Sequence, residues 1–213
     1  FREFPLLVIV ALAVSLLIKT FLVQFFYIPS GSMQNTLQIN DRVAVNKIPF
    51  IAKSIKRGDV VVFRDPANWL PIPLEEPTGN VVIAKAKEVL VFAGVLPNPA
   101  KQFLVKRVIG VAGDKIICCD KDGALTINGE KTTEPYIFAG NKPSELDFNV
   151  TVPEGKIWVM GDHRGASADS RYHQDDVNNG MVPVSKITGR VFGIIWPFEN
   201  FGFVSSKNPL PAK

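Results

Sequence analysis

The N-terminal apolar run constrains this chain more than any other feature of its sequence. Residues 4–18 contain no charged side chain, and after Lys19 and Thr20 the apolar character resumes as far as residue 28. As a helix, residues 4–18 would rise only about 22 Å, whereas residues 4–26 would rise about 34 Å and could cross a bilayer core of about 30 Å. Phe25, Phe26 and Tyr27 would then lie at the lipid–water boundary. We predict a single membrane anchor over residues 1–27, followed by one domain over residues 28–213.

Two other interpretations of this run are a cleavable signal peptide and a buried core helix. A signal peptide has a short apolar core that ends at a cleavage site of small residues. The only tripeptide of that kind, residues 11–13, lies inside the apolar run. An uncleaved span is therefore favoured over both alternatives.

Beyond Ile28 the hydrophobic pattern changes from helical to β. Short apolar runs are broken by Gly, Pro, Asn and Asp, which is typical of an all-β domain and not of βαβ units. The candidate strands are residues 42–46, 59–64, 103–111, 115–118, 124–127, 156–160 and 191–195. Residues 66–99 are rich in proline and are predicted to form an irregular insertion, in which the apolar stretch 81–95 could be helical. The expected fold class is mostly β, with one N-terminal transmembrane helix.

Charge and cysteine content exclude several classes of site. Lys and Arg number 24 against 20 Asp and Glu, and this excess of +4 is too small and too dispersed to indicate nucleic-acid binding. Beside an anchor, scattered cations would add a modest attraction to anionic lipid. Cys118 and Cys119 are adjacent, and because disulfides between neighbours are uncommon we expect two half-buried thiols in a strand. Two histidines and no CxxC pair make a zinc site unexpected.

Three segments could carry chemistry, although each has an ordinary structural explanation. Ser30-Gly31-Ser32-Met33 follows the apolar run and offers hydroxyl nucleophiles, but it could be a simple loop. Lys106 has apolar neighbours on its face of a predicted strand, and burial would leave its amine neutral and able to accept a proton, unless it reaches water at a strand edge. Residues 161–171, GDHRGASADSR, could be a catalytic loop or a well hydrogen-bonded turn. His163 and His173 are the only histidines, and both are expected at the surface.

Taken in order, SGSM, KRVIGVAGD and GDHRGASADSR resemble the boxes of bacterial type I signal peptidase, a membrane-bound Ser-Lys endopeptidase that removes signal peptides from exported preproteins. The resemblance implies that Ser32 is the nucleophile and Lys106 its general base. It implies that Ser30 completes the oxyanion hole and that Ser167 orients Lys106. Asp162 with Arg164, and Asp169 with Arg171, would be supporting pairs.

The resemblance also implies a substrate and a location. The family's shallow pockets for small side chains correspond here to Phe26, Ile28, Met33, Leu37 and Val105. Such pockets imply Ala-x-Ala cleavage sites and an extended substrate added to a strand. The expected location is the cytoplasmic membrane of a bacterium, single-pass, with the catalytic domain outside and in possible transient contact with the secretion machinery. No cofactor, metal or nucleic acid is expected. The alternative function is a membrane-anchored β module that binds a partner without catalysis.

Overall fold

The computed structural model describes residues 7–8, 10, 22–47, 55–71 and 102–210, and these residues form two antiparallel β-sheets. The strands are β1 Val23–Tyr27, β2 Arg42–Asn46, β3 Val60–Arg64, β4 Phe103–Gly110, β5 Lys115–Cys118, β6 Thr126–Ile127, β7 Glu130–Lys131, β8 Phe148–Thr151, β9 Lys156–Met160, β10 Val182–Pro183, β11 Ile187–Trp196 and β12 Gly202–Phe203. Short 3₁₀ helices lie between them: η1 Gly31–Met33, η2 Arg164–Ala166, η3 Ser170–Tyr172, η4 Val184–Lys186 and η5 Phe198–Asn200.

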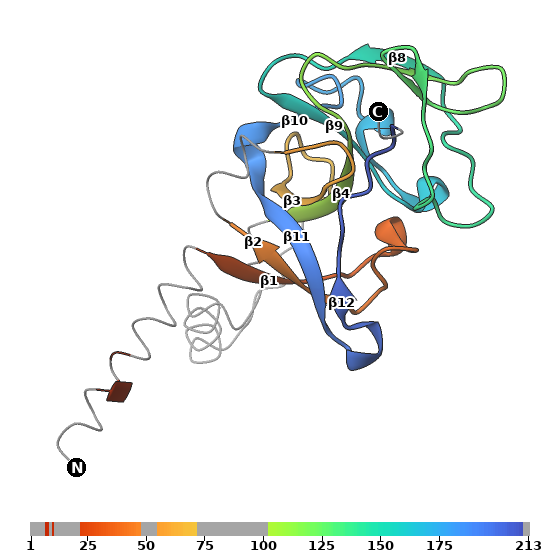
Figure 1. Cartoon of the computed structure of the whole chain (residues 1–213). Coiled ribbons are helices and arrows are strands. Elements are labelled where there is room, and N and C mark those ends of the chain that lie inside the picture. Colours follow the sequence, from red (N-terminus) through yellow and green to blue (C-terminus); the bar gives the residue numbers. More distant parts are fainter. Residues whose placement is uncertain (1–6, 9, 11–21, 48–54, 72–101, 211–213) are drawn as a thin grey trace.

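The larger sheet has the order β1-β2-β11-β3-β4-β9-β10, with β12 on β11, and the smaller has the order β7-β6-β5-β8. Figure 1 shows β8 at one end of the molecule and the β1, β2 and β12 group at the other. The mostly-β prediction is confirmed. The predicted strands at residues 42–46, 115–118 and 156–160 have the bounds observed for β2, β5 and β9.

The larger sheet is buried on both faces around β3. Val60 and Val62 belong to one apolar cluster, whereas Val61 and Phe63 belong to another on the opposite face. A strand covered on both sides needs apolar residues at every position, which explains the uninterrupted Val-Val-Val-Phe sequence. A third cluster, around Trp158 and Ile116, joins β9 to the smaller sheet.

The boundary predicted for the anchor is wrong by at least five residues. Val23–Tyr27 form β1 and pair in register with β2, from Val23 opposite Asn46 to Tyr27 opposite Arg42. An edge strand with aromatic side chains on one face reads in sequence like the end of an apolar helix, because both are rich in Phe and Tyr. In the part of the chain that is described, no helix is long and apolar enough to span a bilayer. Most of the predicted anchor, and residues 72–99 of the predicted insertion, lie outside the described residues.

The expectation of two free thiols at Cys118 and Cys119 is also wrong. The two residues form a disulfide with each other at the end of β5. Cys118 is buried and Cys119 packs against the same apolar cluster as Trp158. Proximity along the chain is sufficient for this bond, so no spacing pattern could have indicated it.

Candidate active site

Ser32 and Lys106 meet in a buried position although 74 residues separate them in sequence. Ser32 is in η1, just after β1, and Lys106 lies in the middle of β4. The Lys106 Nζ lies 2.6 Å from the Ser32 Oγ, and its other hydrogen bond is to the backbone oxygen of Val105 at 3.2 Å. The Lys106 side chain comes from the strand interior, so it has few alternative positions.

The environment of Lys106 favours its neutral form. Burial lowers the pKa of Lys106 from the usual 10.5 to about 8. The negative charges of Asp169 and Asp162 act in the opposite direction and raise this pKa, while the guanidinium of Arg171 lowers it. Desolvation is the largest of these effects, so a substantial fraction of Lys106 is neutral near pH 8 and able to take a proton from Ser32.

The backbone before Ser32 provides two free donors for an oxyanion. Ser30 is in an extended conformation at the N-cap of η1, and its side chain makes no capping hydrogen bond. Ser32 is the second residue of this short helix, where N–H groups have no partner within the turn. The Ser30 hydroxyl and the Ser32 N–H are therefore both available to a developing negative charge.

Asp169 organises the catalytic loop from its centre. Its carboxylate accepts hydrogen bonds from Ser167 Oγ at 2.7 Å and from the Gly161 N–H at 2.9 Å, and it pairs with Arg171. The predicted Asp169–Arg171 pair is therefore present. Among the described residues, Ser167 makes its side-chain hydrogen bond to this carboxylate and not to Lys106. Ser167 lies near the nucleophile all the same, because a Cβ on Gly161 would fall 2.3 Å from Ser167 Oγ and 2.4 Å from the Ser32 carbonyl oxygen.

The predicted pairing of Asp162 with Arg164 is wrong. Asp162 pairs instead with Arg107 through two hydrogen bonds, and all atoms of both side chains are buried. Arg164 pairs with Glu134, far away in sequence. Residues two apart in a turn point in different directions, and each charge was paired by a strand or loop that the fold brought to it. Arg107 was missed as a site residue. The available signal was a charged residue inside an apolar strand, which needs a buried partner.

The residues predicted to line the apolar pockets fall into two groups. Ile28, Met33 and Leu37 are buried in the cluster that also contains Val60 and Val62. Phe26 and Val105 are only partly buried and pack on the edge of that cluster. The structure therefore places all five on one side of Ser32, with Phe26 and Val105 as the members that a ligand can reach.

His163 and His173 are partly buried and not fully solvated. The imidazole of His163 stacks on Phe138 with ring centroids 4.2 Å apart, and the imidazole of His173 stacks on Trp69 at 4.4 Å. Neither forms a hydrogen bond with the side chain of Ser32 in the described part of the chain. Residues 22–47, 55–71 and 102–210 contain no group of three or more His, Cys, Asp or Glu placed to hold a metal ion.

Comparison with known proteins agrees with this geometry. A family described as signal peptidase, peptidase S26, matches residues 1–196. A probable signal peptidase I of Mycobacterium leprae is 36% identical over 97% of this chain and 80% of its own length. Signal peptidase I of Mycobacterium tuberculosis is 37% identical over 98% of this chain and 76% of its own. A probable signal peptidase I-2 of Synechocystis is 32% identical over 92% of this chain and 74% of its own. With a buried serine–lysine pair at its centre, the chain belongs to the signal peptidase family, peptidase S26.

Proposed function

We propose that this chain is a serine endopeptidase that removes N-terminal signal peptides from exported preproteins, with Ser32 as nucleophile and Lys106 as general base. The observation that carries the proposal is the 2.6 Å contact between Lys106 Nζ and Ser32 Oγ in a site where burial lowers the lysine pKa to about 8. A lysine paired only for stability would be held in its charged form by a carboxylate. Here the partner is a hydroxyl, which needs a base before it becomes a good nucleophile.

The proton moves between three groups during the reaction. Neutral Lys106 takes the proton of Ser32 as Oγ bonds to the scissile carbonyl carbon, and the oxyanion is held by the Ser30 hydroxyl and the Ser32 N–H. The Lys106 ammonium then gives this proton to the leaving amine as the carbon–nitrogen bond breaks. In the second half, Lys106 takes a proton from water, whose oxygen attacks the acyl group, and Ser32 Oγ recovers a proton as it leaves.

The edge of β4 is the proposed binding place of the extended substrate. β4 pairs with β3 from Phe103 to Arg107, but β9 covers its other edge only from Arg107 onward. Residues 103–106 thus have a free edge, and it leads to the Lys106 amine. A peptide added here would lie beside Phe26 and Val105, whose limited exposure suits small side chains such as those of an Ala-x-Ala site.

An aromatic surface supports action at a lipid bilayer. Tyr27 and Trp196 both lie opposite Arg42, one on each neighbouring strand, so the three side chains form a row across the sheet. Phe25 and Phe203 fall in the next row, through Ala44 and Gly193. Phe198 and Phe203 are 75% and 90% exposed, which is unfavourable in water and suited to a membrane interface.

This surface and the apolar run before residue 22 motivate the proposed location. The chain would be anchored once in a bacterial cytoplasmic membrane, with its catalytic domain on the outer side, where signal peptides emerge near the secretion machinery. A membrane-anchored binding module without catalysis remains the alternative, and it would keep the aromatic surface but have no use for a base of lowered pKa.

Cleavage of a signal-peptide substrate ending in Ala-x-Ala tests the enzymatic proposal. The wild-type chain, Ser32→Ala, Lys106→Ala and the control Lys115→Ala, an exposed lysine on β5, are compared in detergent. We expect cleavage by the wild type and the control only. Binding of the substrate without cleavage by any of the four proteins would favour the binding module.

Depth-dependent quenching tests the membrane surface. Trp69 and Trp158 are buried, whereas Trp196 is 47% exposed, so quenchers attached to lipid chains report on Trp196. In vesicles containing the chain we expect quenching that Trp196→Phe abolishes. Equal fluorescence with and without lipid quenchers would show that this surface faces water.

A further inference from the structure

Gln34 and His163 form a polar pair directly beside the nucleophile. His163 Nδ1 lies 2.9 Å from Gln34 Oε1, and because an amide oxygen only accepts, Nδ1 carries the proton. The His163 backbone N–H donates to the Ser32 carbonyl oxygen at 3.1 Å. The Gln34 side chain folds back over Gly31, since a Cβ on that glycine would lie 2.8 Å from Gln34 Oε1.

Each member of the pair has one hydrogen-bonding atom left over. With the proton on Nδ1, the Nε2 of a neutral His163 is an acceptor, and it has no protein partner in the described part of the chain. Gln34 Nε2 is a donor and likewise has no partner among the described residues. Both side chains are only half-buried, so water satisfies these atoms until a ligand displaces it. A free donor next to a free acceptor is the complement of one peptide group.

The position of this pair identifies which part of a substrate it can reach. Lys106 is the last residue of the free edge of β4, because β9 begins to cover that edge at Arg107 opposite Met160. The chain continues from Met160 to His163, so a peptide that runs along β4 past Ser32 meets His163 next. The apolar pocket residues lie on the opposite side of Ser32.

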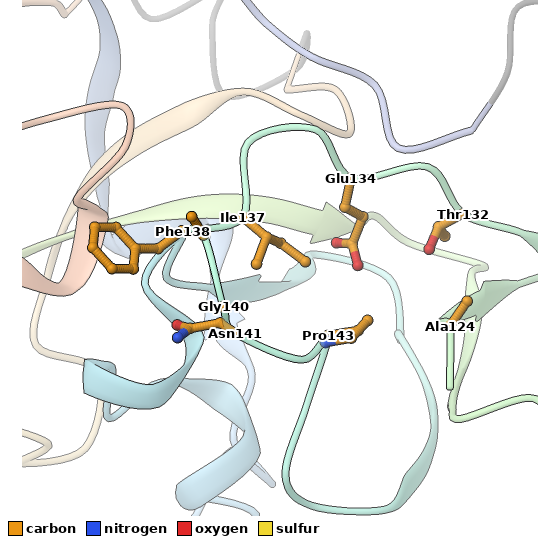
Figure 2. Close-up of a pocket in the computed structure, with 9 residues that line it drawn as sticks. Ala124, Thr132, Glu134, Ile137, Phe138, Gly140, Asn141 and Pro143 are labelled. Carbon is orange, nitrogen blue, oxygen red and sulfur yellow. The ribbon is translucent and has the colours of Figure 1, made fainter. Parts of the chain in front are cut away.

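The wall behind His163 continues away from Ser32. Phe138 stacks on His163, and its backbone N–H donates to the Asp162 carbonyl oxygen at 2.9 Å. The loop that carries Phe138 lines a pocket of about 300 Å³, shown in Figure 2, where the Phe138 ring points away from Glu134 and Pro143. A chain leaving Ser32 over His163 therefore has a shaped surface to follow.

We propose that Gln34 and His163 bind the main chain of the leaving segment, at the peptide group that joins the first two residues after the scissile bond. The Gln34 Nε2 donates to the carbonyl oxygen of that group, and its N–H donates to His163 Nε2. Recognition of the main chain at this place leaves the side chains of the mature protein unselected. The inference rests on the proposed function, because it needs a peptide cleaved at Ser32.

The test compares two substrates that differ in one atom. One is an Ala-x-Ala peptide with several residues after the cleavage site, and in the other the peptide bond between the first two of those residues is an ester. The ester removes the N–H that His163 accepts and weakens the carbonyl acceptor. Values of kcat/KM are measured, with products identified by mass, for wild type, His163→Ala, Gln34→Met and the control Gln38→Met, an exposed glutamine of the same loop.

In wild type and Gln38→Met we expect the ester to lower kcat/KM about five- to tenfold, as the loss of one or two hydrogen bonds predicts. In His163→Ala the ratio falls to about one, and in Gln34→Met it falls to an intermediate value. An ester effect of the same size in wild type and His163→Ala overturns the inference. A third substrate, an anilide with no residue after the cleavage site, keeps the two proposals apart. If wild type cleaves the anilide but shows no ester effect, only this inference fails, and if it cleaves none of the three, the proposed function fails first. Thermal melting of each variant confirms that it is folded.

Discussion

Cleavage by this chain should fall about tenfold for each pH unit below about 8, because only neutral Lys106 can accept the proton of Ser32. With a pKa of about 8, about half of the Lys106 amines are neutral at pH 8, about one in ten at pH 7 and about one in a hundred at pH 6. The shift has one dominant cause, the burial of the ammonium, and the nearby carboxylates of Asp169 and Asp162 oppose it. The rate should therefore approach a plateau above about pH 9.

The assay is kcat/KM between pH 5.5 and 9.5, which reports the ionisation of the free enzyme. The substrate carries no ionisable side chain near its Ala-x-Ala site, so that its own titration does not enter. Tm measured across the same range separates loss of activity from unfolding. A midpoint near 10.5, the usual value for lysine, would show that Lys106 is solvated, and a rate that stays constant from pH 8 to 6 would exclude a lysine base altogether.

Three further changes have expected outcomes. Lys106→Met should abolish cleavage yet raise the free energy of unfolding at pH 7 by about 2 kcal/mol, because burial of the ammonium costs about 3 kcal/mol and the lost hydrogen bond to Ser32 returns about 1. Since the pKa is lower in the folded state, this cost is complete below pH 8 and disappears as pH rises to 10.5, so denaturant titrations at pH 7 and 10 should differ. Gly161→Ala places a methyl 2.4 Å from the Ser32 carbonyl oxygen and should lower kcat/KM about a hundredfold, whereas Gly165→Ala, whose nearest atom would be 3.7 Å away, should leave it unchanged; similar rates for the two would refute this. Arg107→Ala leaves its carboxylate partner buried without an opposite charge and should lower the free energy of unfolding by about 3–5 kcal/mol in urea, and a loss below 1 kcal/mol would contradict that estimate.

Local pattern predicted the strands that alternate or stay apolar over four or more residues. β2, β5 and β9 have their predicted bounds because their side chains repeat with the period of a strand. The two-residue strands β7, β10 and β12 carry no such pattern. They exist because another strand lies beside them, which is a property of the whole fold. β1 was assigned to the anchor because its aromatic side chains match a membrane boundary as well as an edge strand.

The charges of the site show the limit of sequence reasoning most clearly. Asp169 pairs with Arg171 two residues away, as predicted, but Asp162 takes Arg107 and Arg164 takes Glu134. A buried charge must be paired, and any partner that the fold brings within reach will serve. Sequence distance therefore does not identify the partner.

The sequence by itself determined the chemical groups: two serines around a glycine after an apolar run, a lysine among apolar residues of a strand, and a loop of Asp, Ser and Arg. It also determined that Lys106 would be buried, because alternation in a strand follows from backbone geometry alone. Only the tertiary structure decided that Ser32 and Lys106 meet at 2.6 Å and that Gln34 and His163 stand together beside them. Those contacts join residues 74 and 129 positions apart, and they depend on how strands pair and loops pack, which no local pattern specifies.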